Sequence, residues 1–201
     1  MNIQKAQTTP KNTEDRILLN ALQHFCNYGY NGTSVREITS ASKVTKPTLY
    51  YYFKNKEELF TRLAQTCFER VISKINGLDI EQNTYESNVR SIFECMDAIS
   101  AQDPAALKFI HGLVVSPQRG APDVGAKSFL KQIDDQLDRI MRKAVRSGEC
   151  AESKRKKVQI LLAALLGYYT KSVLTLGENE FTDKEILTSL LKHLLDSSKT
   201  S

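Results

Sequence analysis

Residues 33–60 read TSVREITSASKVTKPTLYYYFKNKEELF, and this stretch decides the fold. Ser34 and Glu37 have the spacing of a capping box, in which each side chain accepts an amide proton at the start of a helix. A turn near Lys43 ends this short helix, and Thr45 can cap the next one. The stretch therefore predicts two short helices joined by a tight turn.

The second short helix has one apolar side and one polar side. Leu49 and Phe53 lie four residues apart and share a face, which we expect to anchor the helix on its own core. Small polar residues at its start suit base edges in the major groove, and Lys46 and the tyrosine hydroxyls suit phosphates. From these residues alone, a DNA-reading helix and a plain helical hairpin with packed tyrosines are equally open.

The rest of the chain has apolar residues at helical spacing and no sustained alternation of the strand type. It predicts an all-α fold of about nine helices, which begin near residues 13, 34, 45, 55, 85, 103, 127, 153 and 182. Thr13 is the expected cap of the first helix, which Gly29 is expected to end. We divide the chain into a flexible arm (1–12), a helix-turn-helix DNA-binding domain (13–58), and a helical domain for effector binding and dimerisation (59–201).

The composition of the 201 residues is that of a globular protein: 41% are hydrophobic, 25% are charged, and the net charge is +5. Residues 1–60 hold eight Lys and Arg against five Asp and Glu, so +3 falls in less than a third of the chain. The N-terminus lacks an apolar signal core, and the most apolar run, 160–169, is too short to span a membrane. We expect a cytoplasmic protein without a membrane partner.

The four cysteines are far apart and form no CxxC pair, which favours reduced thiols. The histidines are isolated as well, so neither a metal nor a catalytic triad is indicated. We therefore expect no enzyme activity and no cofactor.

The stretch 13–60 resembles the DNA-binding domain of the tetracycline-repressor (TetR) family. The resemblance rests on YGYNGTSVREI at 28–38, on V-T-K-x-T-L-Y-x-Y-F at 44–53, and on K-N-K-E-E-L at 54–59. It implies a homodimeric transcriptional repressor that binds a double-stranded DNA operator and leaves it when a small-molecule effector binds. Lys43 and Pro47 stand where the family commonly has glycine, and a lysine with positive φ at 43 would be strained.

The resemblance also implies DNA-binding roles. It assigns base reading to four residues, namely Thr45, Lys46, Pro47 and Thr48. It assigns phosphate contacts to Tyr50, Tyr51 and Lys56, and to the start of the second helix at Thr33 and Ser34. Lys43 adds a cation beside the DNA. Arg36 has the fork that fits guanine, although a solvated arginine paired with a carboxylate is an equal alternative.

The C-terminal half carries an expected effector pocket and an expected dimer interface. The pocket candidates are Phe68, Phe93, Met96, Phe109, His111 and Tyr168, for which core packing is the competing role. Because the apolar faces of the middle helices carry no acid, the effector is expected to be uncharged or lipophilic. The broad stripes of the last two helices predict a four-helix dimer interface that includes Leu162, Leu165, Tyr169, Leu187, Leu191 and Leu194.

Two alternatives come from other classes of protein. Asp134, Asp135 and Asp138 spell DDxxD, which helical prenyl-transferring enzymes use to hold magnesium pyrophosphate. The preferred interpretation is a solvated helix face with ion pairs Asp135–Arg139 and Asp138–Arg142, because no second aspartate-rich motif exists. The other alternative is a DNA-binding protein without an effector.

Overall fold

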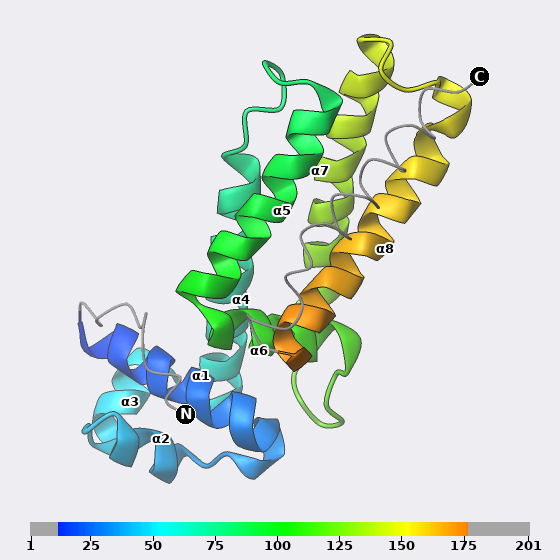
Figure 1. Ribbon diagram of the computed structural model, residues 1–201. Helices are drawn as coiled ribbons and strands as arrows, with labels where there is room; N and C mark the ends of the chain where they lie inside the picture. Colours follow the sequence, from blue (N-terminus) through cyan, green and yellow to red (C-terminus); the bar gives the residue numbers. More distant parts are fainter. Residues whose placement is uncertain (1–11, 177–201) are drawn as a thin grey trace. The chain divides into compact units, whose positions relative to one another are not determined.

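The computed structural model describes the backbone of residues 12–176 and the side chains of residues 12–167. In this range the chain forms helices and no strand, which confirms the all-α prediction (Figure 1). The helices are α1 (Thr13–Gly32), α2 (Val35–Ala41), α3 (Lys46–Tyr52), α4 (Lys56–Asn76), α5 (Tyr85–Gln102), α6 (Pro104–Val115), α7 (Ala126–Arg146) and α8 (Glu152–Leu176). The helix expected from residue 182 lies outside the described residues.

Short polar side chains start the helices. Ser34 and Glu37 form the expected capping box of α2, Thr45 caps α3, and Asp103 caps α6 ahead of Pro104. Thr13 was the wrong cap for α1, because the Asn12 side chain accepts the Asp15 amide at 2.8 Å. The side-chain carbonyl oxygen of Asn12, one residue before Thr13, thus supplies the acceptor for an amide at the helix start that has no partner within the helix.

The backbone of α1 is interrupted at Gly29, where the sequence predicted the end of the helix. Gly29 has φ 70 and bends the helix, which then continues to Gly32. This conformation is open to glycine without a steric penalty, and it is not helical, so the chain leaves the regular helix at Gly29 and resumes it for a last turn that ends at Gly32. A short, kinked last turn leads into α2.

Backbone contacts divide the chain into two compact units. The first holds α1, α2, α3, most of α4, and α6 with the loop that follows it, up to residue 127. The second holds the end of α4, α5, α7 and α8. A boundary drawn at residue 58 does not anticipate that α6 packs with the N-terminal helices.

The core of the first unit is built around Phe60 of α4. Its ring lies 4.9 Å from the rings of Phe25 and Tyr30 of α1, and 5.4 Å from that of Phe109 of α6. Edge-to-face contacts at these distances are favourable beyond the burial of apolar area. Phe109 therefore ties α6 to the N-terminal helices.

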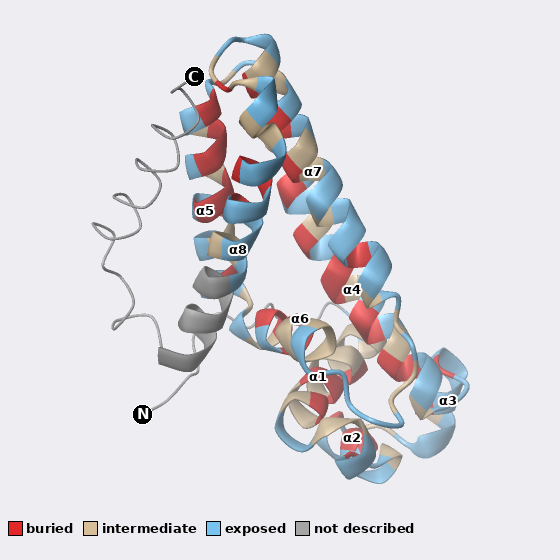
Figure 2. Cartoon of the chain, turned by 90° about the vertical axis from the view of Figure 1, so that its right-hand side faces the viewer, coloured by how far each residue is buried: buried red, intermediate tan, exposed pale blue. Residues whose placement is uncertain are grey.

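The core of the second unit lies among α5, α7 and α8. Its fully buried members include Val89, Ile140, Met141, Val158 and Leu162. Figure 2 shows the buried residues recurring along α5 and α7, as expected for amphipathic helices that share a core. Within the described part of the chain, no helix is both long and apolar enough to cross a lipid bilayer.

Candidate nucleic-acid interface

The connection between α2 and α3 is a tight turn with a left-handed residue. Lys43 has φ 51, and the Ser42 and Val44 amides donate to the carbonyl oxygens of Ile38 and Thr39 at 2.9 and 3.0 Å. A lysine in this conformation is strained, as the sequence predicted for this position. Its exposed side chain puts a cation at the entrance to α3.

The α3 helix is anchored on one side and exposed on the other. Leu49 is 0% exposed and Phe53 is 2% exposed, so these two side chains fix the helix to the unit. On the opposite side Tyr51 is 83% exposed and Tyr50 is 47% exposed. A helix of two turns that presents large aromatic and polar groups to solvent has the shape of a groove-reading element.

The start of α3 is polar and held in one arrangement. Thr45, Lys46 and Pro47 are exposed, and Thr48 is half-buried. The Thr45 hydroxyl accepts the Thr48 amide at 3.2 Å, and the two hydroxyl oxygens lie 2.8 Å apart. This pair fixes the direction of the Thr48 hydroxyl, so the polar edge of α3 is preorganised.

Two amides at the start of α2 are already hydrogen-bonded within the protein, which leaves fewer free donors for a phosphate than the sequence implied. The Ser34 hydroxyl accepts the Glu37 amide at 3.2 Å, while the Glu37 carboxylate accepts the Ser34 amide at 2.8 Å. This backbone hydrogen bond lowers the pKa of Glu37. Ser34 thus enters any DNA contact with its amide already bonded, whereas Arg36 is exposed.

Thr33 and Lys56, which were expected to contact phosphate, both bond to main-chain carbonyls of the first unit. Thr33 is 2% exposed, and its hydroxyl donates to the Gly29 carbonyl at 2.8 Å. The Lys56 ammonium donates to the carbonyls of Tyr30 and Thr33 at 2.9 and 3.1 Å and lies 4.2 Å above the Tyr30 ring. Both residues hold the end of α1, where cations complement the helix dipole.

The expected effector residues do not gather in one unit. Phe68 and Phe109 are buried in the first unit, and His111 is half-buried there. Phe93 and Met96 pack in the core of the second unit. The side chain of Tyr168 lies outside the described residues.

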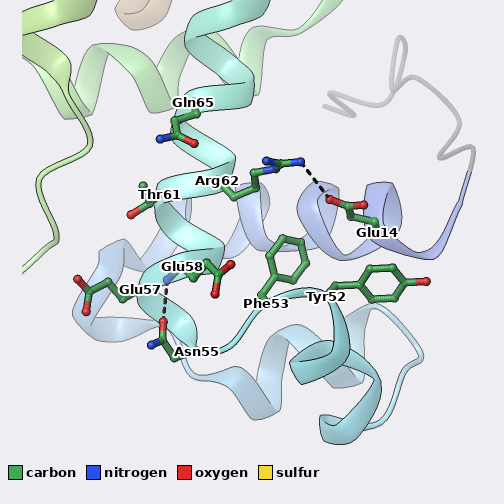
Figure 3. Close-up of a pocket in the computed structure, with 9 residues that line it drawn as sticks. All are labelled: Glu14, Tyr52, Phe53, Asn55, Glu57, Glu58, Thr61, Arg62 and Gln65. Carbon is green, nitrogen blue, oxygen red and sulfur yellow. Dashed lines mark hydrogen bonds and ion pairs between the residues drawn. The ribbon is translucent and has the colours of Figure 1, made fainter.

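The first unit also has an open surface hollow of about 570 Å³ between α1, the end of α3, and α4 (Figure 3). Its charged groups include Glu14, Glu57, Glu58 and Arg62, and the Arg62 guanidinium lies 3.9 Å from the Glu14 carboxylate. None of the expected effector residues lines this hollow. Its polar lining does not fit a lipophilic ligand.

The DDxxD aspartates join α7 to α8. Asp138 accepts from Arg142 at 2.5 Å and from Arg155 of α8, and Gln159 of α8 donates to the Asp134 carboxylate at 2.7 Å. Hydrogen bonding by Arg142, with the charges of Arg142 and Arg155, lowers the pKa of Asp138.

The expected Asp138–Arg142 pair is present, but Arg139 bonds to Gln136 and not to Asp135. The face is therefore not simply solvated, because Arg155 and Gln159 reach it from α8. Sequence reasoning missed both residues, since partners on another helix leave no spacing signal. Among residues 12–167, no group of three His, Cys, Asp or Glu is placed to hold a metal ion.

The α8 residues expected at a dimer interface point inward. Leu162 is 0% exposed and belongs to the core of the second unit, and Leu165 packs against that core. Up to residue 167, the large apolar side chains that α8 exposes are Ile160, at 59%, and Leu161, at 41%. For Tyr169 the side chain, and for Leu187, Leu191 and Leu194 the whole residue, lie outside the described part.

Comparison by sequence identifies the N-terminal region. Residues 17–63 match the family described as bacterial regulatory proteins, tetR family. The biofilm operon icaADBC negative transcriptional regulator IcaR of Staphylococcus epidermidis is 36% identical over 59 residues, which is 29% of this chain and 32% of IcaR. The similarity thus spans about a third of that relative.

Comparison by structure extends over almost the whole chain. A regulatory protein of the tetR family from Rhodococcus superposes with a TM-score of 0.73 at 16% identity, covering 95% of this chain and 99% of that one. FadR from Bacillus subtilis, solved in complex with stearoyl-CoA, gives 0.70 at 18% identity over 92% and 98% of the two chains. At these identities the likeness shows the fold alone, a helix-turn-helix domain followed by a helical domain. Residues 17–63 thus match the N-terminal domain of the tetR family of bacterial regulatory proteins, and the rest of the chain resembles members of that family in fold alone.

Proposed function

We propose that this protein is a cytoplasmic, homodimeric transcriptional repressor that binds a specific DNA operator. The observation that carries the proposal is the build of α3, which is anchored by the fully buried Leu49 while Tyr51 is 83% exposed. A helix fixed on its inner side and polar on its outer side can enter a major groove without unfolding its own core.

Within this proposal the exposed residues divide into two groups. Thr45, Lys46, Pro47 and Thr48 read bases from the start of α3. The tyrosines Tyr50 and Tyr51, together with Ser34 and Lys43, contact phosphates, and Arg36 reaches either a guanine or a phosphate. Thr33 and Lys56 support the site from inside.

The test is an unbiased selection of duplexes by the purified protein at physiological salt. We expect a roughly palindromic sequence, with half-sites about 34–36 Å apart for two recognition helices in successive major grooves. Lys46→Ala removes a cation from the start of α3, so it is expected to weaken binding to most sequences and to lower the salt slope by about 0.9 per subunit. Tyr51→Phe removes an uncharged hydroxyl, so it is expected to weaken binding to most sequences without changing the salt slope. Thr48→Val is expected to change the preferred sequence.

A matched control is Lys131→Ala, which removes an exposed lysine of α7 in the second unit. It is expected to bind like the wild type. A wild-type protein that enriches no duplex over random DNA would overturn the proposed function.

We propose that the second copy packs on the exposed apolar side of α8. Ile160 and Ala164 are exposed four residues apart, and Gly167 is exposed one turn further along. Residues at this spacing form one stripe on a helix, and small residues let a partner helix approach closely. A short recognition helix reads only a half-site, so tight binding needs two linked copies.

We propose a lipophilic effector that releases the operator. FadR from Bacillus subtilis was solved with stearoyl-CoA bound, and this chain has a similar fold. The first experiment is therefore the titration of the operator complex with stearoyl-CoA, with free coenzyme A as the control. Release by stearoyl-CoA alone supports a lipophilic effector. Retention of DNA with every lipophilic compound tried favours the effector-independent alternative.

We propose that the chain is not an enzyme of the prenyl-transferring type. Asp138 is held by two arginines and Asp134 by Gln159, so both carboxylates already have partners on the protein. Magnesium is not expected to raise the melting temperature. A magnesium-dependent rise that disappears in a double variant, Asp134→Ala with Asp138→Ala, would revive the enzyme alternative.

A further inference from the structure

The loop between α6 and α7 (116–125) contacts the corner at which α1 ends and α2 begins. The Gln118 side-chain oxygen accepts the Tyr30 amide at 2.6 Å, and the Asn31 side chain donates to the Arg119 carbonyl at 2.9 Å. These pairs are 88 residues apart in the sequence and lie within the first unit. The corner is therefore held by a segment distant in the chain.

Gly29 lies directly against the Gln118 side chain. Its φ of 70 is a conformation that L side chains rarely adopt, and a Cβ at this position would lie 2.6 Å from the Gln118 oxygen and 2.9 Å from its Cδ. A side chain at this position would displace the Gln118 amide from the kink and would also be strained by the positive φ. The kink and the glutamine thus form one fitted contact.

The same corner is held from a second side by α4. Lys56 bonds to the carbonyls of Tyr30 and Thr33, and the Thr33 hydroxyl bonds to the Gly29 carbonyl. Tyr30 therefore has its amide bonded by one segment and its carbonyl by another. Its ring also packs on Phe60 at 4.9 Å.

The direction of α2 depends on this corner. Thr33 directly precedes Ser34, the cap of α2, and α2 packs on both α1 and α3. A change in the backbone at residues 29–33 therefore turns α2, and α3 turns with it. Gln118 does not need to touch DNA to affect how α3 meets it.

We propose that Gln118 is a positioning residue for DNA binding, which fixes the kink at Gly29 and so the orientation of the helix-turn-helix. This inference rests on the proposed function. It assigns a role in DNA binding to a residue 65 positions after the end of the α2–α3 motif at Phe53.

Gln118→Ala is expected to weaken operator binding about tenfold, within the 5–150-fold range typical of coupling between separate sites. It is also expected to lower the salt slope by about 0.9 for each phosphate contact that the reoriented helices lose. Hydrogen exchange of the Tyr30 amide in the free protein is expected to speed up. Gln118→Glu keeps an acceptor for that amide and is expected to restore both the slow exchange and the salt slope.

The matched control is Gln65→Ala, which truncates an exposed glutamine of α4 and is expected to leave all three measurements unchanged. Wild-type affinity and salt slope in Gln118→Ala would overturn the inference. An affinity loss at unchanged slope, which disappears on cooling, would also overturn it, because Gln118 would then act on stability alone. If the wild type binds no duplex specifically, the proposed function fails first, and the exchange rates still report whether Gln118 holds the corner.

Discussion

Two residues with positive φ lie on either side of α2, and the steric strain of that conformation differs between them. Gly29, with φ 70, has no Cβ and adopts this conformation freely. Lys43, with φ 51, carries a Cβ that crowds the following carbonyl. A lysine kept at a strained position is consistent with a role for its charge at the DNA.

Lys43→Gly is therefore expected to stabilise the free protein and to weaken DNA binding. Removing the left-handed strain stabilises by about 1 kcal/mol, on the low side of the 1–2 kcal/mol for that conformation, because glycine also loosens the unfolded chain. Loss of the cation lowers the salt slope of binding by about 0.9. Urea unfolding and operator titration at several salt concentrations measure the two effects.

Lys43→Ala separates the two causes. It removes the charge but keeps a Cβ, so it is expected to weaken DNA binding as much as the glycine variant does without the gain in stability. Equal stabilisation by both variants would show that strain at residue 43 is not the source.

The thiols of the first unit give a second prediction at the scale of single residues. Burial raises the pKa of Cys26 to about 11 and that of Cys67 to about 12, and the Cys26 thiol donates to the Ala105 carbonyl at 3.4 Å. At pH 8 only about a thousandth of Cys26 is thiolate, and the thiolate is the reactive form. We expect a disulfide reagent to modify the half-buried Cys95 first, as measured by peptide mass spectrometry. Rapid labelling of Cys26 in folded protein would contradict this order.

The sequence predicted the environment of some single residues and not of others. The strained position of Lys43 was predictable, because the turn places one residue in a conformation that glycine usually supplies. The role of Lys56 was not, because its partners are the main-chain carbonyls of Tyr30 and Thr33, 26 and 23 residues away. Every residue has a main-chain carbonyl, so the residue types at positions 30 and 33 do not indicate that Lys56 bonds there.

At the scale of helices, the capping residues predicted most of the starts correctly. Ser34, Thr45, Asn55 and Asp103 each accept an amide three residues later, which is a local interaction written in the sequence. The pairing of α7 with α8 was not predicted, because Arg155 and Asp138 are 17 residues apart on different helices. Helical spacing predicts neighbours on one helix only.

This pairing predicts a loss of stability in acid. Because the folded pKa of Asp138 is lowered, its carboxylate contributes stability above the pKa of the unfolded chain. That contribution is lost as the pH falls from about 4, the ordinary value for aspartate, through the folded pKa. Asp138→Asn is expected to cost about 1–2 kcal/mol at pH 7 and progressively less below pH 4. Urea unfolding between pH 3 and pH 7 measures the difference.

Asp135→Asn is the matched control, since Asp135 is exposed on the same helix. It is expected to change the stability by less than about 0.5 kcal/mol at any pH in this range. If both variants lose the same amount, the link from Asp138 to Arg155 contributes nothing specific.

At the scale of the whole molecule, the sequence predicted the number and class of the described helices better than their partners. The sequence of α6 is apolar nearly all round, and such a helix is buried but can pack in any direction. It packs with α1, where Phe109 meets Phe60. The stripe of α8 likewise predicted burial of Leu162, but it did not separate burial in the chain's own core from burial against a second copy.

The exposed fractions of the α8 side chains predict which of them can contact a second copy of the chain. Leu162 is 0% exposed within one chain, so its side chain has no surface to offer a partner, whereas Ile160 is 59% exposed. Ile160→Arg is therefore expected to leave the fold intact and to yield a monomer, because a charge buried against the second copy is costly without a partner. With one half-site read per molecule, operator binding is expected to fall sharply.

Leu162→Ala is expected to behave in the opposite way, with a loss of about 2–5 kcal/mol in stability from the cavity and no direct effect on association. Sedimentation velocity at micromolar concentration, with and without operator, distinguishes the two variants. A wild-type protein that sediments as a monomer with operator present would rule out the dimer and, with it, the proposed two-site reading of DNA. An Ile160→Arg protein that remains a dimer would move the interface away from the described face of α8 but would leave two-site reading in place.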